Sequence, residues 1–276
     1  MFDILKKTVI TDNVIEYVLS APKIAAKALP GQFILLRVDE EGERVPFTIS
    51  DYDREKGTIT LLIQTVGATT MQLAKMNEGD CLHDIVGPLG KATHLDADKI
   101  LLVAGGIGVA VLYPQAKHLK SLGKKVVCVM GARNVSLLAY LKEMQEVCDT
   151  LYVTTDDGTY GEKGFVTNVV QRLFDQDKNA FELVFAVGPL PMMRAVCNVT
   201  KEIGVKTVVS MNPIMIDGTG MCGCCRLTVN GVTKYACVDG PEFDGHEVDF
   251  NEVINRNRYF VDIEKEHVCN LTGEVR

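Results

Sequence analysis

The sequence lacks any run of roughly 18 consecutive apolar residues, the length that a membrane-spanning helix needs. It also lacks a basic N-terminal stretch followed by an apolar segment of signal-peptide length, so we expect the protein to stay in the cytoplasm. The excess of positive charge typical of a nucleic-acid surface is missing, because the net charge at pH 7 is −7. With 47% apolar residues and no internal repeat or low-complexity segment, the 276 residues predict a globular protein of two or more domains.

A plausible catalytic triad or acid–base pair is missing as well. The five histidines are scattered, and each is more typical of a surface or hydrogen-bonded core residue than of a ligand: His83, His94, His118, His246 and His267. The lack of a triad or acid–base pair is consistent with chemistry that bound cofactors supply. Electron transfer by a cofactor requires no general acid or nucleophile from the protein.

Cysteine, in contrast, is abundant, and nine cysteines in a cytosolic protein favour metal or cofactor binding over disulfides. Four residues near the C-terminal end have the spacing of a plant-type [2Fe–2S] site in which a carboxylate replaces the first thiolate. They are Asp217, Cys222, Cys225 and Cys237, with four, two and eleven residues between them. Aspartate is a harder donor than a thiolate, so it should alter the reduction potential and proton coupling of the cluster rather than abolish it.

Two other interpretations of these cysteines stay open. A structural zinc site also favours thiolates with a first pair two residues apart, and the thiols could instead be reduced and unliganded. The glycines of the segment favour the cluster, because Gly218, Gly220 and Gly223 can take positive φ and aim backbone N–H groups at cluster sulfides. Cys224 breaks the spacing and is predicted not to be a ligand.

Residues 1–96 predict a small antiparallel barrel. Short alternating segments separated by turns are typical of its strands, and they cover Ile4–Thr11, Ile15–Ala21, Gln32–Val38, Val45–Ser50, Thr58–Gln64 and Cys81–Val86. A helix is expected from Thr69 to about Met76, directly after a glycine turn. Free N–H groups and threonine hydroxyls at its start are the arrangement that receives a phosphate, although a threonine N-cap alone would explain the same residues.

Residues 97–210 predict a parallel α/β unit. Apolar runs typical of strands buried on both faces cover Ile100–Ala104, Val126–Met130, Leu151–Thr155 and Leu183–Val187, and a helix to about Leu122 follows the first. Each run ends in a glycine-containing or polar loop, and ligands of parallel sheets bind beyond the carboxyl ends of the strands. The segment Gly105–Ala110 is not a dinucleotide fingerprint, and it could serve only close packing of helix on strand.

Five segments taken in chain order are Arg44–Thr48, Gly67–Thr70, Gly105–Ala110, Gly188–Met193 and the cluster frame 217–237. Together they resemble the ferredoxin-NADP reductase superfamily, and within it the electron-transfer subunits related to that of dihydroorotate dehydrogenase. Residues 212–223 and 236–246 look like the small subunit of NADH-dependent reduced ferredoxin:NADP oxidoreductase, also called the sulfide dehydrogenase small subunit. The dihydroorotate branch would have cysteine in place of Asp217. The likeness covers nearly the whole chain and assigns residues 211–276 to the cluster.

The resemblance implies an FAD site in the barrel. In the strand motif R-x-[YF]-[ST], Pro46 and Phe47 would contact the isoalloxazine ring, and the Thr48 hydroxyl would lie near the flavin N5. The motif's arginine, a pyrophosphate ligand, would fall at Val45, whereas this chain has Arg44. The second flavin segment corresponds to Gln64, Gly67, Thr69 and Thr70.

The resemblance also implies a nicotinamide-nucleotide site over the loops of the α/β unit, at Gly106, Gly108, Gly131, Arg133, Asp157, Gly188 and Pro189. Val187 stands where many members have cysteine near the nicotinamide, a change that leaves hydride transfer possible. Acidic side chains near the adenosine ribose repel a 2′-phosphate, so Asp156 and Asp157 favour NADH, although Arg133 could serve a phosphate.

By resemblance, NADH would transfer a hydride to FAD, and the [2Fe–2S] cluster would carry single electrons onward. The sequence has no second flavin site and no [4Fe–4S] pattern, so a heterodimer with a larger flavoprotein carrying [4Fe–4S] clusters is implied. That complex would couple NADH and ferredoxin oxidation to NADP reduction, or run in reverse by electron bifurcation. The alternatives are a dihydroorotate dehydrogenase B electron-transfer subunit, a sulfide dehydrogenase subunit, and a zinc-containing, non-catalytic nucleotide-binding regulator.

Overall fold

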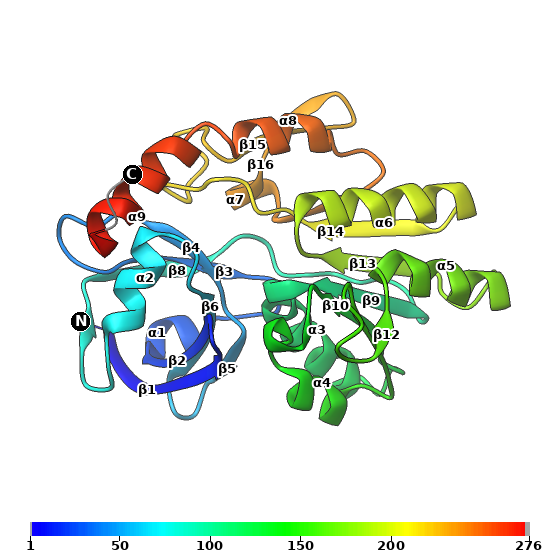
Figure 1. Ribbon diagram of the computed structural model, residues 1–276, viewed down its shortest axis with the longest axis horizontal. Helices are drawn as coiled ribbons and strands as arrows, with labels where there is room; N and C mark the ends of the chain where they lie inside the picture. The colour runs from blue at the N-terminus through cyan, green and yellow to red at the C-terminus, as the bar shows by residue number, and fades with distance from the viewer. Residues whose placement is uncertain (1, 274–276) are drawn as a thin grey trace.

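The computed structural model describes residues 2–273 and has three consecutive parts (Figure 1). Antiparallel sheets come first, a parallel sheet with helices on both faces follows, and a C-terminal part returns across both. In Figure 1 the last helix, α9 (Val261–Thr272), lies beside α2 (Ala68–Lys75) of the first part. No helix within residues 2–273 combines the length and apolar character that crossing a membrane requires.

The N-terminal part consists of two antiparallel sheets around one core, as the predicted barrel requires. The five-stranded sheet has the order β5-β6-β2-β1-β7, from Asp51–Asp53, Thr58–Gln64, Val14–Ser20, Phe2–Thr11 and Cys81–Leu82. The three-stranded sheet has the order β4-β3-β8, from Val45–Thr48, Phe33–Arg37 and Asp84–Leu89. A short helix, α1 (Pro22–Ala25), packs on the same core as the inward-facing side chains Tyr17, Ile34 and Leu61.

Two predicted strands are each divided where the chain passes between these sheets. The predicted strand Val45–Ser50 ends at Thr48, because the Ile49 N–H donates to Gln32 in one sheet while the Ser50 N–H donates to Thr60 in the other. The predicted strand Cys81–Val86 divides in the same way, with β7 pairing with β1 and β8 pairing with β3. Alternation of apolar residues cannot reveal such a change of partner, which forms the corners of the barrel.

The second part is a seven-stranded sheet of order β12-β11-β10-β9-β13-β14-β17. Its parallel strands are Glu162–Lys163, Thr150–Thr155, Val127–Ala132, Ile100–Gly105, Leu183–Val187 and Lys206–Ser210, in that spatial order. The four predicted strands are present, and β12 and β14 were not predicted. Alternate residues of β9 face opposite cores, since Leu101 and Val103 join one and Leu102 and Ala104 the other.

Helices cover both faces of this sheet (Figure 1). The face of Leu102 is covered by α3 (Val109–Ser121) and α4 (Leu141–Val147), and the face of Leu101 by α5 (Val166–Gln176) and α6 (Leu190–Ile203). Two 3₁₀ turns, Gly106–Gly108 and Val135–Leu137, follow β9 and β10. Because β9 is buried on both faces, its sequence is continuously apolar.

The C-terminal part is integrated with the other two. It contains the hairpin β15–β16 (Arg226–Val229, Val232–Tyr235), α7 (Ala236–Asp239), β17 (Glu242–Asp244), α8 (Phe250–Arg256) and α9. Strand β17 pairs antiparallel with β14 and so becomes the last strand of the second sheet. Cys225, Leu227 and Cys237 share one apolar core with Phe33 and Leu35 of the barrel.

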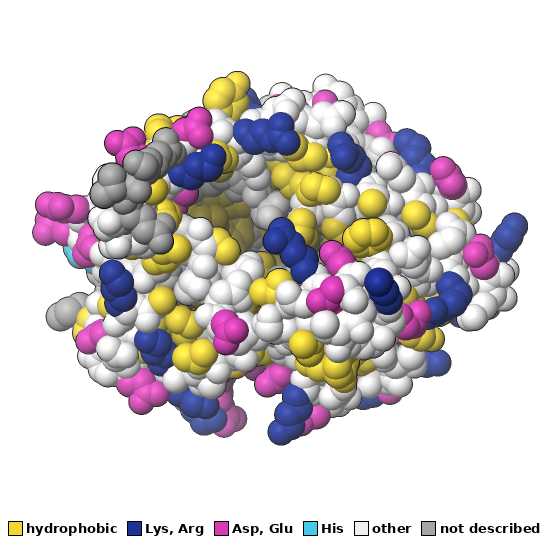
Figure 2. Space-filling model, in the orientation of Figure 1, with side chains coloured by type: hydrophobic (Ala, Val, Ile, Leu, Met, Phe, Trp, Pro, Cys, Tyr) yellow, Lys and Arg dark blue, Asp and Glu magenta, His cyan; other side chains and the backbone are white. Residues whose placement is uncertain are grey.

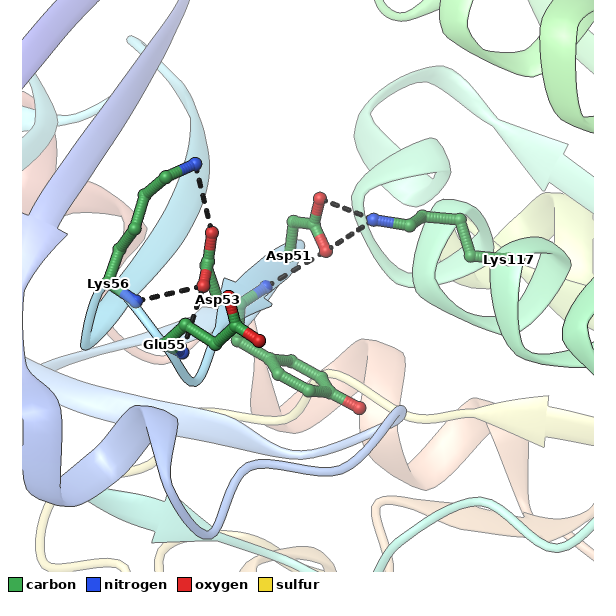
Figure 3. Close-up of polar contacts among 6 residues, drawn as sticks. Asp51, Asp53, Glu55, Lys56 and Lys117 are labelled. Carbon is green, nitrogen blue, oxygen red and sulfur yellow. Dashed lines mark hydrogen bonds and ion pairs between the residues drawn. The ribbon is translucent and has the colours of Figure 1, made fainter.

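Polar contacts join the barrel to the parallel sheet at a second place. Lys117 of α3 reaches across to Asp51 of β5, with its ammonium nitrogen 2.7 and 2.8 Å from the carboxylate oxygens (Figure 3). The Tyr140 hydroxyl donates to the Glu16 carboxylate of β2, and Tyr140 packs in the same core as Val14. Neighbouring Asp53 bonds instead within its own turn, to Lys56 (Figure 3). The first two parts therefore meet through both apolar and polar contacts.

We predict that Gly108→Ala destabilises the fold by about 1–3 kcal/mol, more than Gly105→Ala does. A Cβ at Gly108 would lie 2.4 Å from the Val187 carbonyl oxygen, which is backbone and cannot turn aside. A Cβ at Gly105 would meet mainly the Met192 sulfur, at 2.3 Å, which a flexible side chain can withdraw. Urea denaturation of both variants measures the difference, and equal midpoints would contradict this account of the close approach.

Candidate cofactor-binding site

The glycine turn before α2 is organised by the Thr70 side chain. Its hydroxyl oxygen accepts hydrogen bonds from the backbone N–H groups of Val66 and Gly67, at 3.0 and 2.9 Å. Gly67 is the N-cap residue of α2, so no threonine occupies that position. The simple threonine N-cap considered from the sequence therefore does not account for Thr69 and Thr70.

An acidic side chain from the far end of the chain lies at the start of α2. The Ala68 N–H donates to the Glu264 carboxylate of α9 at 2.7 Å. A Cβ at Gly67 would lie 2.4 Å from the same carboxylate, so glycine leaves the room it needs. The Thr69 hydroxyl donates to Glu43 at 2.6 Å. The helix start thus already holds an oxygen anion, as its unpaired N–H groups favour.

The flavin motif residues lie on β4, an edge strand of the three-stranded sheet. Pro46, Phe47 and Thr48 are half-buried, and Thr48 pairs with Phe33 of β3. Arg44, directly before the strand, forms an ion pair with Asp84 at 3.0 Å. Both partners are partly exposed, and such pairs contribute about 0–1 kcal/mol, so the pair holds the arginine only weakly.

The residues predicted to bind the nicotinamide nucleotide follow four adjacent strands. Gly106 and Gly108 come after β9, Gly131 and Arg133 lie at the end of β10 and just after it, Asp157 follows β11, and Gly188 and Pro189 follow β13. Because β11, β10, β9 and β13 are neighbours in the sheet, these residues form a continuous row at its carboxyl edge. The loops of Arg133 and Asp157 are joined by a backbone hydrogen bond of 3.2 Å.

The glycines of this row divide into two kinds. A Cβ at Gly131 would lie 2.4 Å from a Val166 methyl group, and one at Gly188 would lie 3.0 Å from the Gly105 backbone. Gly131, Gly188 and Gly108 therefore allow close packing of the backbone, which was one of the two interpretations of the glycine segment considered from the sequence. Gly106 has a φ of +52° and open space where a side chain would be. Gly106 is therefore the glycine of this row that leaves room for a ligand against the backbone.

The acidic side chain of Asp157 is held ionised at this edge. Its carboxylate accepts hydrogen bonds from the Thr159 N–H and hydroxyl, at 2.9 and 2.7 Å. Both bonds lower the pKa of the Asp157 carboxyl, and the bond from the Thr159 hydroxyl has the larger effect. Arg133 is exposed on the neighbouring loop. This edge of the sheet thus presents both Asp157 and Arg133, the acidic and basic groups that the sequence suggested for the adenosine ribose of the nucleotide.

The four predicted cluster ligands form two pairs. Cys225 Sγ and Cys237 Sγ are 3.3 Å apart and buried, and burial raises the pKa of the Cys237 thiol to about 12. The Asp217 carboxylate accepts from the Cys222 N–H at 2.8 Å, on the exposed side of the loop. The hydrogen bond from the Thr219 N–H, also 2.8 Å, is the main cause of a lowered Asp217 pKa.

The donor set consists of one carboxylate and three thiols, all of which can bind metal ions. Within residues 2–273 no three His, Cys, Asp or Glu side chains converge on one point, as a single tetrahedral ion would require. A dinuclear cluster instead takes two ligands on each iron. Gly218, Gly220 and Gly223 have φ of +73°, +80° and +71°, as the sequence predicted. Positive φ at these positions lets the backbone turn tightly around the first pair of candidate ligands.

The cluster loop packs directly on the barrel. A Cβ at Gly218 would lie 2.7 Å from a Leu89 methyl carbon and 2.9 Å from one of Leu35, on β8 and β3. Strand β3 is also the hydrogen-bonded neighbour of β4, which carries Thr48. Figure 2 shows a hollow on this face with hydrophobic side chains at its floor, between α7 and α9 on one side and β3 and β4 on the other. The candidate cluster loop therefore packs on β3, the strand next to the candidate flavin strand β4.

Sequence reasoning did not single out Glu264, Leu35 or Leu89. Glu264 is 196 residues from its partner Ala68, and nothing in the spacing of charges on α9 links the two. The two leucines follow the ordinary pattern of a core strand. Only the folded chain reveals that they form the floor for the cluster loop.

Comparison with known protein families divides the chain in the same way. Residues 1–94 match the oxidoreductase FAD-binding domain, and residues 102–198 match the oxidoreductase NAD-binding domain. Residues 212–249 match the iron-sulfur cluster binding domain of dihydroorotate dehydrogenase B. The Arg44–Thr48 and Gly67–Thr70 segments fall in the first match, the glycine row in the second, and all four candidate ligands in the third.

Full-length relatives give the same picture. A Thermotoga maritima protein, called a homolog of the dihydroorotate dehydrogenase B (NAD(+)) electron transfer subunit, is 44% identical over 99% of this chain and 97% of its own. An uncharacterized Clostridium beijerinckii protein is 46% identical over 94% and 90%. A structure solved in work on flavin-based electron bifurcation by NADH-dependent reduced ferredoxin-NADP oxidoreductase is 42% identical, with a TM-score of 0.92 over 99% and 98%. The chain therefore belongs to the family of electron-transfer subunits, with FAD-binding, NAD-binding and iron–sulfur domains, that includes the dihydroorotate dehydrogenase B subunit and its homologs.

Proposed function

We propose that this chain is the NADH-linked subunit of an electron-bifurcating complex of the ferredoxin-NADP oxidoreductase type. FAD would accept a hydride from NADH, and a [2Fe–2S] cluster would carry single electrons to a larger flavoprotein partner. The solved structure of 42% identity, which comes from work on that complex, supports the assignment. The observation that carries it is the packing of the Gly218 loop on Leu35 and Leu89.

That contact matters because electron transfer between two cofactors needs a short and fixed separation. The cluster loop shares one apolar core with β3, the strand that pairs with the flavin strand β4, so relative motion of the two sites would have to disrupt packed side chains or strand pairing. We propose domain limits of 1–96, 97–210 and 211–276, one domain for each cofactor. The third domain shares an apolar core with the first two. We therefore infer that both sites are held in place before any partner binds.

The proposed FAD ligands are the residues that line β4, the end of β6 and the start of α2: Arg44, Pro46, Phe47, Thr48, Gln64, Gly67, Thr69 and Thr70. The N–H groups of the α2 turn would bind the diphosphate, while Phe47 would pack on the ring system. Arg44 would have to leave Asp84 to reach the diphosphate, at little cost for a partly exposed ion pair.

The proposed cluster ligands are Asp217, Cys222, Cys225 and Cys237. The buried pair Cys225 and Cys237 would hold one iron, and Asp217 and Cys222 the other, as their pairing supports. Cys224 would stay unliganded. Asp217 and Cys222 form the less buried of the two pairs. The harder donor, Asp217, would therefore lie on the side that is open to a partner.

The proposed nucleotide ligands are Gly106, Gly108, Gly131, Arg133, Asp157, Gly188 and Pro189, with NADH as the preferred form. The hydrogen bonds that keep Asp157 ionised support this preference, because a negative carboxylate repels a 2′-phosphate and accepts a bond from a free 2′-hydroxyl. Gly106 leaves open space over the sheet edge for the diphosphate.

A second candidate is the electron-transfer subunit of dihydroorotate dehydrogenase B. The cluster-domain match over residues 212–249 and the names of relatives such as the Listeria innocua protein, 34% identical over 89% of this chain, favour it. Purification from the native source separates the two. A dihydroorotate-oxidising partner chain would support the second candidate, and a larger flavoprotein with [4Fe–4S] clusters would support the first.

We predict that the cofactor-loaded protein reduces its flavin with NADH at least tenfold more efficiently than with NADPH, a difference of about 1.4 kcal/mol. Asp157→Asn should narrow this preference, because it removes the charge that repels the 2′-phosphate. Stopped-flow reduction under anaerobic conditions measures both rates. Asp12→Asn, which removes an exposed carboxylate in the turn between β1 and β2, serves as the control and should leave the ratio unchanged. Equal efficiency with the two nucleotides in the unaltered protein would refute the assignment.

We predict that Cys222→Ser, Cys225→Ser and Cys237→Ser each lose most of the bound iron, whereas Cys224→Ser keeps it. Iron quantification and the visible absorption of anaerobically purified protein measure the loss. Asp217→Cys should retain the cluster with a changed reduction potential, because a softer ligand replaces a harder one. Iron that persists in all three cysteine variants would contradict the ligand assignment.

We predict that Glu264→Gln strengthens FAD binding several-fold at low ionic strength. The carboxylate accepts the Ala68 N–H that a bound diphosphate would use, so removing its charge relieves a competition between two anions. Flavin fluorescence during dilution of the loaded protein measures retention. Glu266→Gln, an exposed position on the same helix, is the matched control. Weaker flavin binding in Glu264→Gln than in the control would show that this carboxylate assists the flavin.

A further inference from the structure

One carboxyl group outside the candidate ligand sets lies where the three parts of the chain meet. Glu242 is the first residue of β17, and its side chain is partly buried. The Thr93 hydroxyl donates a hydrogen bond to the Glu242 carboxylate, and the Gln115 side-chain amide donates to the Thr93 hydroxyl. Thr93 follows the barrel, Gln115 lies on α3, and Glu242 belongs to the C-terminal part. The three side chains thus form one buried polar chain across all three parts.

The backbone around this chain is tightly packed. A Cβ at Gly31 would lie 2.0 Å from the Thr93 hydroxyl oxygen and 2.9 Å from the Glu242 carboxylate, and Gly31 has a φ of +87°. The Lys91 N–H donates to the Gly240 carbonyl at 2.7 Å, and the Met211 N–H donates to the Pro241 carbonyl at 2.8 Å. The Glu242 side chain is therefore fixed by its surroundings.

No cation balances this carboxyl group. Among residues 2–273 no Lys, Arg or His forms an ion pair with Glu242. The elements packed against it present Thr93, Gln115 and, across the β14–β17 pair, Ser210, all of which are neutral. Among the charged and titratable side chains near Thr93 and Glu242 in sequence, Lys91, His94 and Asp244 are exposed, whereas Asp239 is partly buried and accepts a hydrogen bond from the Tyr235 N–H. Burial raises the pKa of the Glu242 carboxyl to about 7, and the bond from Thr93 opposes part of that rise.

Short stretches of chain and strand pairings connect Glu242 and its neighbours to both proposed redox positions. Gly31 stands two residues before Phe33, which pairs with Thr48 of the flavin strand. On the other side, Glu242 follows the proposed cluster ligand Cys237 by five residues. Its strand partner Ser210 ends β14, the neighbour of β13, after which Gly188 and Pro189 come. Added negative charge at either redox position would raise the free energy of the Glu242 carboxylate relative to its neutral form, because like charges repel.

We propose that Glu242 is a proton-holding residue that takes up one proton from solvent when the flavin or the cluster gains negative charge. A hydride brings two electrons and one proton, so reduction leaves a surplus negative charge that a neutral carboxyl group accommodates better than a carboxylate does. The O–H bond forms on the Glu242 carboxylate, and the proton is released again when the electrons leave. Thr93 and Gln115 are positioning residues that hold the carboxyl group in place. This inference rests on the proposed function.

Infrared difference spectroscopy of the cofactor-loaded protein, reduced against oxidised at pH 8, tests the proposal. We expect reduction to produce the C=O band of a protonated carboxyl group, and we expect Glu242→Gln to lose it. Glu247→Gln, an exposed carboxyl on the same segment, should keep the band. A band that persists in Glu242→Gln, or no band in the unaltered loaded protein, overturns the proposal.

Thermal unfolding against pH checks the carboxyl group itself, without any cofactor. Because the folded pKa exceeds the unfolded value, the folded protein binds more protons between about pH 4.5 and 7, and stability falls as pH rises through this window. The Tm of Glu242→Gln relative to the unaltered protein should therefore be higher at pH 8 than at pH 5. Equal Tm differences at both pH values overturn the proposal. Loss of flavin and iron from the unaltered protein would instead refute the proposed function, which makes the two failures distinguishable.

Discussion

The structure depends on one apolar core that all three parts of the chain complete. Phe33 and Leu35 of the barrel, Leu101 and Val103 of the parallel sheet, and the cysteine-bearing C-terminal part belong to the same packed cluster. Close-packed interiors tolerate little relative displacement, so this core fixes the cluster loop against β3, the strand that pairs with the flavin strand β4. Rapid electron transfer over a short distance needs such rigidity more than it needs any single side chain.

Much of the fold could be predicted from local pattern. The continuous apolar runs of β9, β10 and β13 identify strands buried on both faces, and the structure has them with shifts of one or two residues. What local pattern could not supply was the choice of partner. The chain changes sheets at Ile49 and at His83 because successive backbone groups find partners in different strands. Likewise, β17 joins the parallel sheet through a pairing with β14 that no periodicity encodes.

In the candidate site, the sequence predicted the backbone conformation at positions where only glycine takes positive φ readily. Positive φ at Gly218, Gly220 and Gly223 follows from the need of a tight ligand loop. The sequence could not separate glycines that admit a ligand from those that admit a neighbouring strand, because both require a missing side chain. Gly106 and Gly108 differ in backbone conformation and in what surrounds them, and neither difference is visible in the sequence. Residues that act over long sequence separations, such as Glu242 and Glu264, carry no local signal at all.

The pairing of β17 with β14 also bears on how the protein is made. During synthesis the barrel and the first six strands of the sheet emerge before β17, so the edge of β14 and part of the shared core stay uncovered until the last quarter of the chain has left the ribosome. Exposed strand edges are prone to association with other chains. The candidate cluster ligands lie in the same late part of the chain. Insertion of the cluster would then coincide with the pairing of β17 against β14.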